Sequence, residues 1–258
     1  MKHRQFILAT DLDGTFLGGS QDQRAALYDW IESARSDVGL IFVSGRDLPF
    51  IEYLCRETGV PWPDYVIGDV GTTIAQVHPE NDDDGRRVAP IPQLETEISK
   101  LWNNRADEIK AALDGASGLT LQPTPFRYRV SYDLDPGTYD DAAGHRIREM
   151  GFDVLISDNR FFDVLPPGIS KGPSLKRLIE FLEVEDEKVL VAGDTMNDLS
   201  LFETGLRGVA VGNSEAGLLA KVTDKSHVYV ASSHGAGGIA EAVHHHEMSP
   251  KKRPPLNV

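Results

Sequence analysis

The sequence predicts an α/β protein in which a parallel sheet is interrupted by an inserted α+β module. Apolar, strand-length segments at residues 6–10, 38–43 and 188–192 each end in polar residues and glycine, as buried parallel strands do where they meet a loop. Segments with helical spacing of apolar residues follow them. Between residues 80 and 166 the pattern changes to helix, strand, helix and two strands, which is typical of an α+β module.

The first part of the chain alternates strands and helices. Apolar residues at helical spacing predict a helix over 22–35, and a second helix is predicted from about residue 47 to residue 59. The stretch 65–77 reads as a strand that bends at Gly71 into another strand. The charged, proline-rich stretch 79–92 predicts a domain boundary.

The inserted module follows this boundary. An apolar stripe predicts one long helix over 94–114, and alternation predicts a half-buried strand over 127–133. A second helix is predicted over 139–150, and the stretch 152–165 reads as a hairpin. After residue 166 the strand and helix pattern of the first part resumes.

These elements divide the chain into three parts. We expect a core built from residues 1–79 and 167–248 and an inserted module at residues 80–166. Residues 249–258 are basic and rich in proline, which predicts a flexible tail.

The composition excludes several classes of function. A formal net charge of −14 argues against binding to nucleic acid or to anionic membranes. No apolar run approaches the roughly 20 residues of a membrane-spanning helix, and the first strand begins too early to follow a signal peptide. The single cysteine, Cys55, excludes an internal disulfide and fits the reducing cytoplasm. We expect a small-molecule substrate and a monomer or weak homo-oligomer.

Two aspartates, Asp11 and Asp13, follow the first strand and precede Gly14. Residues two apart on an extended chain face the same side, and ligands of open α/β sheets bind at the carboxyl ends of strands. Two carboxylates so close need a cation, a shared proton or distance from each other, and a divalent metal with oxygen ligands is the obvious candidate. Taken alone, the motif is better explained as a polar turn, in which Asp caps the next segment and Gly makes the bend.

Three further loops carry related chemistry. The hydroxyl of Ser44 and the backbone at Gly45 can bind a phosphate oxygen, although a serine here also suits a helix N-cap. Lys171 stands at the head of a helix and can present its ammonium to an anion. Asp194 and Asp198 flank a strand-to-helix turn, so that they can converge on one metal ion.

The order and spacing of these four loops resemble those of the haloacid dehalogenase superfamily. The resemblance implies a Rossmann-like parallel-sheet core, a C2-type cap in the place of the inserted module, and Mg²⁺ as cofactor. It implies that Asp11 is a nucleophile that forms an aspartyl-phosphate, and that Asp13 is the general acid and base. The presence of Asp13 argues for prompt hydrolysis, because related ion pumps have threonine there and a longer-lived aspartyl-phosphate.

The resemblance also implies the residues that bind phosphate and metal. The phosphate would be held by Ser44, Gly45 and Lys171. The implied metal ligands are Asp11, Asp13 through its backbone carbonyl, Asp194 and, in support of these, Asp198.

Within the superfamily, four stretches look like those of sucrose-phosphate phosphatases and related disaccharide-phosphate phosphatases, namely 127–136, 163–172, 199–204 and 232–238. By this likeness sucrose 6-phosphate is the leading substrate, and mannosylfructose phosphate or another glycosyl or hexose phosphate is the alternative. A catalytically inactive regulatory relative is a remote alternative. The expected substrate contacts are Arg46, Thr72, Arg129 and Asn197. The pair Thr72-Thr73 replaces a more polar pair beside the sugar site, which leaves the identity of the sugar open.

Overall fold

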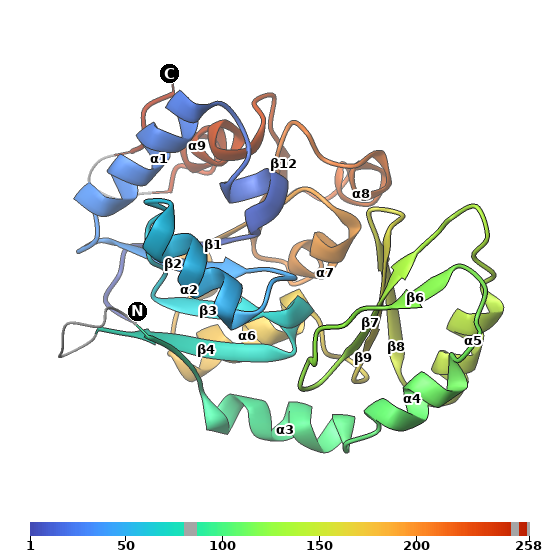
Figure 1. The fold of residues 1–258 in the computed structure, drawn as a ribbon. Helices are drawn as coiled ribbons and strands as arrows, with labels where there is room; N and C mark the ends of the chain where they lie inside the picture. The colour runs from blue at the N-terminus through green and yellow to red at the C-terminus, as the bar shows by residue number, and fades with distance from the viewer. Residues whose placement is uncertain (80–86, 249–252, 257–258) are drawn as a thin grey trace.

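The structure, a computed structural model, describes residues 1–79, 87–248 and 253–256 and contains two sheets (Figure 1). The acidic residues 82–84, interpreted above as part of a boundary, lie outside the described residues. No helix in the described ranges is long and apolar enough to cross a membrane.

The larger sheet has eight strands in the order β12-β11-β10-β1-β2-β3-β4-β5. The strands from β12 to β3 are parallel, and β4 and β5 join them as antiparallel edge strands. The predicted parallel-sheet core is therefore confirmed. Its strands are β1 (Phe6–Thr10), β2 (Val38–Val43), β3 (Tyr65–Gly68), β4 (Thr73–His78), β5 (Arg87–Pro90), β10 (Val189–Gly193), β11 (Arg207–Ala210) and β12 (Val228–Val230).

Helices cover both faces of this sheet because its central strands are apolar on both sides. In β1, Phe6 and Leu8 pack into one hydrophobic cluster and Ile7 and Ala9 into the other. The helices that contribute to the first cluster are α1 (Gln21–Ser33), α2 (Leu48–Glu57) and α9 (Gly235–His245). Those that contribute to the second are α3 (Pro92–Trp102), α6 (Lys171–Phe181), α7 (Leu199–Phe202) and α8 (Ala216–Val222).

Local signals set where the first two helices begin. The Ser20 hydroxyl accepts a hydrogen bond from the Gln23 N–H at 3.1 Å, and the Gln23 side chain accepts one from the Ser20 N–H at 3.0 Å. This reciprocal capping pair satisfies two backbone donors at the start of α1. The Asp47 carboxylate caps α2 in the same way, by accepting from the Phe50 N–H at 3.0 Å.

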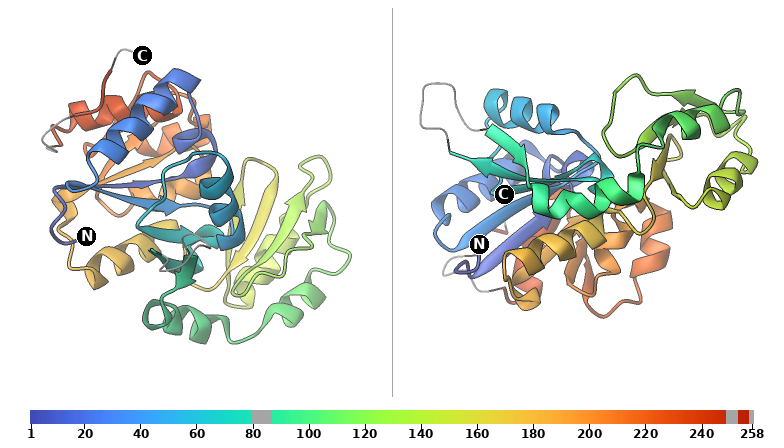
Figure 2. Two further views of the ribbon diagram at one scale, coloured as in Figure 1. Left: turned by 60° about the vertical axis from the view of Figure 1, so that its left-hand side comes forward. Right: turned by 90° about the horizontal axis from the view of Figure 1, so that it is seen from below.

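The smaller sheet forms a separate lobe beside the larger one (Figure 2). It is antiparallel in the order β6-β7-β9-β8. One face packs against the lobe's helices through Ile109 and Ile147, whereas the other carries polar residues such as Ser131 and Asp163. The elements of this lobe are α4 (Ala106–Ala112), β6 (Leu119–Leu121), β7 (Val130–Leu134), α5 (Ala142–Glu149), β8 (Asp153–Ser157) and β9 (Phe161–Leu165).

The prediction of one long helix over 94–114 is wrong. The chain forms α3 and α4 instead, and it breaks at Asn103 and Asn104, whose φ angles are 51° and 55°. Asparagine enters this left-handed region more readily than most residues and commonly ends a helix there. The apolar stripe continues across the break, so hydrophobic spacing alone did not reveal it.

The larger sheet also extends beyond the boundary predicted at residue 79. Strand β5 pairs with β4, and Ile98 of α3 packs into the core of the larger sheet. We therefore propose that the inserted lobe begins near Trp102, whose indole packs in the smaller sheet's core. A charged, proline-rich stretch is typical of any exposed connection, including one between two paired strands.

The tail predicted at 249–258 falls mostly outside the described residues. Within the described part, Pro254 is buried and its carbonyl accepts a hydrogen bond from His244 Nε2 at 2.7 Å.

Candidate active site

The predicted site residues converge because of the strand order. Strand β1 lies between β10 and β2, so the loops that carry Asp11, Ser44 and Asp194 leave neighbouring strands at one edge of the sheet. The chain order of the strands reverses between β1 and β10, and ligands of open α/β sheets bind at such a reversal. The topology thus places these three loops where ligands usually bind.

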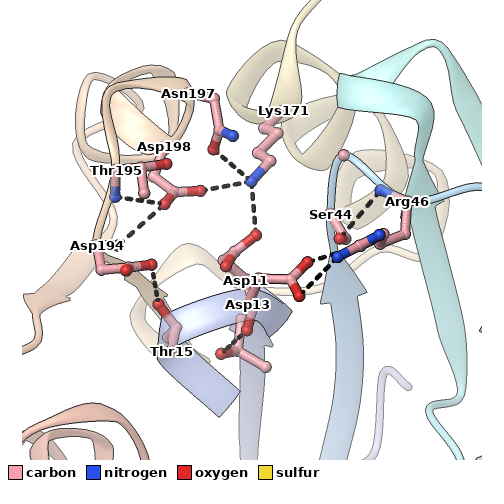
Figure 3. Close-up of polar contacts among 12 residues, drawn as sticks. Asp11, Asp13, Thr15, Ser44, Arg46, Lys171, Asp194, Thr195, Asn197 and Asp198 are labelled. Atoms are coloured by element: carbon pink, nitrogen blue, oxygen red, sulfur yellow. Dashed lines mark hydrogen bonds and ion pairs between the residues drawn. The ribbon is translucent and has the colours of Figure 1, made fainter. Parts of the chain in front are cut away.

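A buried acidic cluster lies at this edge and consists of Asp11, Asp194 and Asp198 (Figure 3). Each offers a carboxylate oxygen, and the three oxygens lie within 4.8 Å of one another. Asp194 Oδ1 also accepts a hydrogen bond from the Thr15 hydroxyl at 2.7 Å. The cluster contains three of the four residues predicted to bind metal.

Lys171 is the cation of this cluster. Its ammonium donates to Asp11 Oδ1 at 2.7 Å, Asp198 Oδ1 at 2.7 Å and Asn197 Oδ1 at 2.6 Å, and the residue is fully buried. All three ammonium donors therefore have acceptors. Burial alone would lower the pKa of Lys171, but Asp11 and Asp198 outweigh it and raise that pKa, so the lysine is charged.

The three carboxylates carry more negative charge than Lys171 balances. Burial raises the pKa of Asp11 well above its ordinary value, against the opposing effect of Lys171. Burial and the neighbouring Asp198 raise the pKa of Asp194 to about 7. Three ionised carboxylates and one ammonium sum to a charge of −2. A divalent cation with oxygen ligands, such as Mg²⁺, fits this donor set in charge and in chemistry.

Asp198 also holds the backbone of its own loop. Its Oδ2 accepts from the N–H groups of Asp194 at 3.0 Å and Thr195 at 3.1 Å, while Oδ1 accepts from Lys171. Both oxygens are thus engaged, so Asp198 positions Asp194 and Lys171 in addition to lying in the acidic cluster.

Gly14 allows the first loop to approach Asp194. Its φ is +80°, and a Cβ atom at this position would lie 2.2 Å from Asp194 Oδ2. Asn213 ties the same two loops together, because its side-chain N–H group donates to the Gly14 carbonyl at 3.0 Å and to Asp194 Oδ2 at 3.3 Å.

The sequence prediction omitted Asn213 and Thr15. The rule that polar residues after strands face the site would have found Asn213, which follows β11 closely.

The two aspartates of the first loop have different partners. Asp11 contacts Lys171, whereas the Asp13 carboxylate accepts from Arg46 Nε at 2.8 Å and from Arg46 Nη2 at 3.0 Å. The two side chains thus pair with different protein cations, and the metal contact implied for the Asp13 backbone carbonyl stays a prediction. The strand ends at Thr10, so the two-residue alternation no longer applies beyond it.

The loop Ser44–Arg46, here called the phosphate loop, is held from its own backbone. The buried Ser44 hydroxyl oxygen accepts from the Arg46 N–H at 3.2 Å. The turn Asp69–Gly71 braces the loop, since the Asp69 N–H donates to the Arg46 carbonyl at 2.9 Å. A Cβ atom on Gly71 would lie 2.3 Å from the Ser170 carbonyl carbon, so glycine also lets the start of α6 approach.

A cavity of about 690 Å³ lies between these loops and the smaller sheet. Four of the predicted residues do not line it. Ser44, Lys171 and Asp198 are buried beside it, and Thr72 is buried with its hydroxyl donating to the Asp69 carbonyl at 2.9 Å. The predicted residues that line it are Asp11, Asp13, Gly45, Arg46, Arg129, Asp194 and Asn197. The smaller sheet's lobe adds residues that the sequence prediction omitted: Gln122, Thr124, Phe126, Ser157, Asp158, Arg160, Phe161 and Asp163.

The fold and this cluster together define a class, the phosphoric monoester hydrolases of the haloacid dehalogenase superfamily, as the sequence predicted. Comparison with known families is more specific. The family model described as sucrose-6F-phosphate phosphohydrolase matches residues 4–247, so the chain belongs to this family.

Individual relatives include two sugar-phosphate phosphatases and one synthase. The solved sucrose-phosphatase of Synechocystis sp. PCC6803, in complex with sucrose and phosphate, is 30% identical with a TM-score of 0.83, over 96% of this chain and 100% of that one. A mannosylfructose-phosphate phosphatase of Agrobacterium fabrum is 27% identical over 95% of this chain and 98% of its own length. A glucosylglycerol-phosphate synthase of Pseudomonas anguilliseptica is 39% identical over 93% of this chain, which spans only 30% of the synthase.

Proposed function

We propose that this chain is a Mg²⁺-dependent phosphatase that hydrolyses a sugar phosphate through an aspartyl-phosphate intermediate. The observation that carries the proposal is Asp11, which lines the cavity and is hydrogen-bonded to buried Lys171 within a cluster of three carboxylates. Membership of the phosphohydrolase family supports it.

In the first proposed step, Asp11 forms a bond to phosphorus and the bond from phosphorus to the sugar oxygen breaks. Asp13 donates a proton to that leaving oxygen. In the second step Asp13 accepts a proton from water, whose oxygen bonds to phosphorus as the Asp11 carboxylate leaves. Lys171 lowers the repulsion between the Asp11 carboxylate and the anionic phosphate. Bound Mg²⁺ would supply further charge neutralisation at Asp11 and Asp194.

If Asp13 is the general acid, the loss of rate on its substitution depends on how readily the leaving group departs without a proton. We expect Asp13→Asn to slow esters of poor leaving groups such as sugars by about 10²–10⁴-fold, and p-nitrophenyl phosphate much less, because p-nitrophenolate needs no proton to leave. The difference is measured in kcat/KM for the two esters, because this ratio covers the steps up to formation of the phosphoenzyme and not the later hydrolysis, in which Asp13 acts as base for both esters. Equal losses for the two esters would contradict the acid role.

The raised pKa of Asp194 predicts that Mg²⁺ binds more tightly as pH rises. A carboxyl with a pKa of about 7 is roughly ten times more ionised at pH 8 than at pH 6, so we expect about tenfold tighter binding at pH 8. Titration calorimetry in two buffers with different ionisation enthalpies would show proton release on binding. Asp194→Asn should weaken this pH dependence without abolishing it, because the raised pKa of Asp11 also contributes. An affinity independent of pH in the unchanged chain would contradict the assignment.

Sucrose 6-phosphate is the leading substrate, since the family and the Synechocystis relative are both named for sucrose phosphate. Mannosylfructose phosphate is the alternative, and the 39% identity to a glucosylglycerol-phosphate synthase adds glucosylglycerol phosphate as another candidate. Ranking these esters by kcat/KM tests the proposal, because contacts with the leaving group set this ratio. If the folded, Mg²⁺-loaded protein turns over none of a broad ester panel, the inactive regulatory alternative is the correct one.

A cytoplasmic location and a monomeric or weakly associated state remain predictions of the sequence. The single cysteine, Cys55, is buried, and its presence alone supports a reducing location only through the sequence argument given above.

A further inference from the structure

Arg129 links the inserted lobe directly to the phosphate loop. Its Nη2 donates to the Gly45 carbonyl at 2.9 Å, although the two residues are 84 positions apart, and its Nη1 donates to Asp163 Oδ1 at 3.1 Å. The guanidinium lies over the Phe126 ring, 3.6 Å from its centroid. Arg129 is only 6% exposed. Asp163 and Phe126 therefore fix this side chain from within the lobe while it reaches out to Gly45.

The contact with Gly45 constrains the group that is expected to bind phosphate. The Gly45 carbonyl and the Arg46 N–H belong to one planar peptide unit, so a donor that fixes the carbonyl also fixes the direction of the N–H. That N–H donates to the Ser44 hydroxyl oxygen at 3.2 Å. With its oxygen so occupied, the Ser44 hydroxyl keeps its own proton free to donate to a phosphate oxygen.

The turn Asp69–Gly71, which also supports the phosphate loop, has a strained backbone. The loop therefore depends more strongly on its contact with Arg129. The Val70 N–H donates to the Ser44 carbonyl at 3.1 Å, but Val70 has a φ of 59° and Asp69 a φ of 52°. A β-branched residue rarely adopts a positive φ, and such strain persists only where the surroundings impose it. Asp69 Oδ1 lies 3.6 Å from Arg129 Nη2 and has no hydrogen-bond partner among the described residues. Arg129 thus supplies the nearest positive charge to this turn.

We propose that Arg129 is a positioning residue that orients the phosphate loop from the inserted lobe, rather than a residue that contacts the sugar. The proposal rests on the phosphatase function proposed above. It predicts that removal of the guanidinium weakens the binding of the phosphoryl group whatever the leaving group is.

The decisive variant is Arg129→Met, with inorganic phosphate as the probe. We expect the inhibition constant of phosphate to be about tenfold higher for this variant, which corresponds to one lost hydrogen bond in the loop. We expect kcat/KM to fall by similar factors, up to about 10²-fold, for p-nitrophenyl phosphate and for a disaccharide phosphate. If only the disaccharide phosphate loses kcat/KM and phosphate inhibits as before, Arg129 is a sugar contact and the proposal is overturned.

Arg105→Met is the matched control. Arg105 also donates to a backbone carbonyl, that of Met150 at 3.1 Å, pairs with a carboxylate, Glu108, and lies over an aromatic ring, Phe152. All of these contacts are inside the lobe and away from the cavity residues. We expect this control to leave phosphate inhibition unchanged. If inhibition by phosphate weakened equally in both variants, the cause would be lower stability of the lobe in general, and the proposal would be overturned.

Two further variants keep the test valid if Arg129→Met folds poorly. The double variant Arg129→Met/Asp163→Asn removes both buried charges and should show the same weaker phosphate inhibition. Arg129→Lys should recover the melting temperature but little of the phosphate affinity. An ammonium lacks the planar, diverging N–H groups with which the guanidinium bonds to Asp163 and Gly45 at the same time. Full recovery of affinity in Arg129→Lys would overturn the proposal.

Phosphate binding also separates the two proposals. If calorimetry shows that Arg129→Met binds phosphate about tenfold more weakly than the unchanged chain does, the positioning role holds even if no ester is hydrolysed. The absence of all turnover in the unchanged chain would contradict the proposed function alone. Equal calorimetric affinities in the two proteins would contradict the positioning role alone.

Discussion

Asp11→Asn is expected to lower kcat for every phosphate ester by about 10⁴-fold or more, because an amide cannot replace the attacking carboxylate. Quenched-flow measurement with a labelled ester should show no covalent phosphoenzyme in the variant. Exposed Asp22 in the first turn of α1 provides the matched control, and Asp22→Asn should leave kcat unchanged. If Asp11→Asn kept a kcat near that of the protein without the substitution, the nucleophile would be another residue.

The same variant should fold normally. Burial raises the pKa of Asp11, and the negative charges of Asp198 and Asp194 add to this. A carboxyl whose pKa is raised on folding stabilises the protein below its unfolded pKa near 4, and this contribution is lost as pH rises toward the folded value. Without Mg²⁺, the unchanged protein should therefore become less stable with rising pH, and Asp11→Asn should do so less steeply. A lower melting temperature for Asp11→Asn at pH 8 would contradict this.

Lys171→Met is expected to abolish turnover and to lower the free energy of unfolding by about 3–5 kcal/mol, because it leaves buried acceptors without their cation. The acceptors that would lose their hydrogen-bond donor are Asp11, Asp198 and Asn197. Urea unfolding without Mg²⁺ measures the change. Added Mg²⁺ should restore part of the stability, since it supplies positive charge to the same carboxylates.

The control for Lys171→Met lies on the same helix. Lys176 pairs with Asp186 at the surface, and Lys176→Met should change stability by less than about 1 kcal/mol. If Lys171→Met proved as stable as this control, the buried ammonium would not hold the cluster together, and the site would need another organising cation.

The convergence of the strand-end loops could be predicted from the sequence because their signals are local. Asp11, Ser44 and Asp194 each follow a short, mostly apolar and fully buried strand, and a parallel sheet brings such positions to one edge whatever the rest of the chain does. The helix over 94–114 was predicted wrongly because its interruption depends on two asparagines in left-handed conformation, which the apolar stripe does not reveal. Thr72 was expected in the site, but its hydroxyl is used within its own turn.

The sequence by itself determined which functional groups stand at the ends of the parallel strands, because strand ends and loops are specified by neighbouring residues. The order of these groups resembles that of the haloacid dehalogenase superfamily, and this resemblance implied the reaction class. Only the tertiary structure decided which groups contact one another. Arg46 pairs with Asp13 across 33 residues, and Arg129 reaches Gly45 across 84. Such contacts depend on how the inserted lobe and the strand-end loops pack together, and local backbone preferences do not encode that packing.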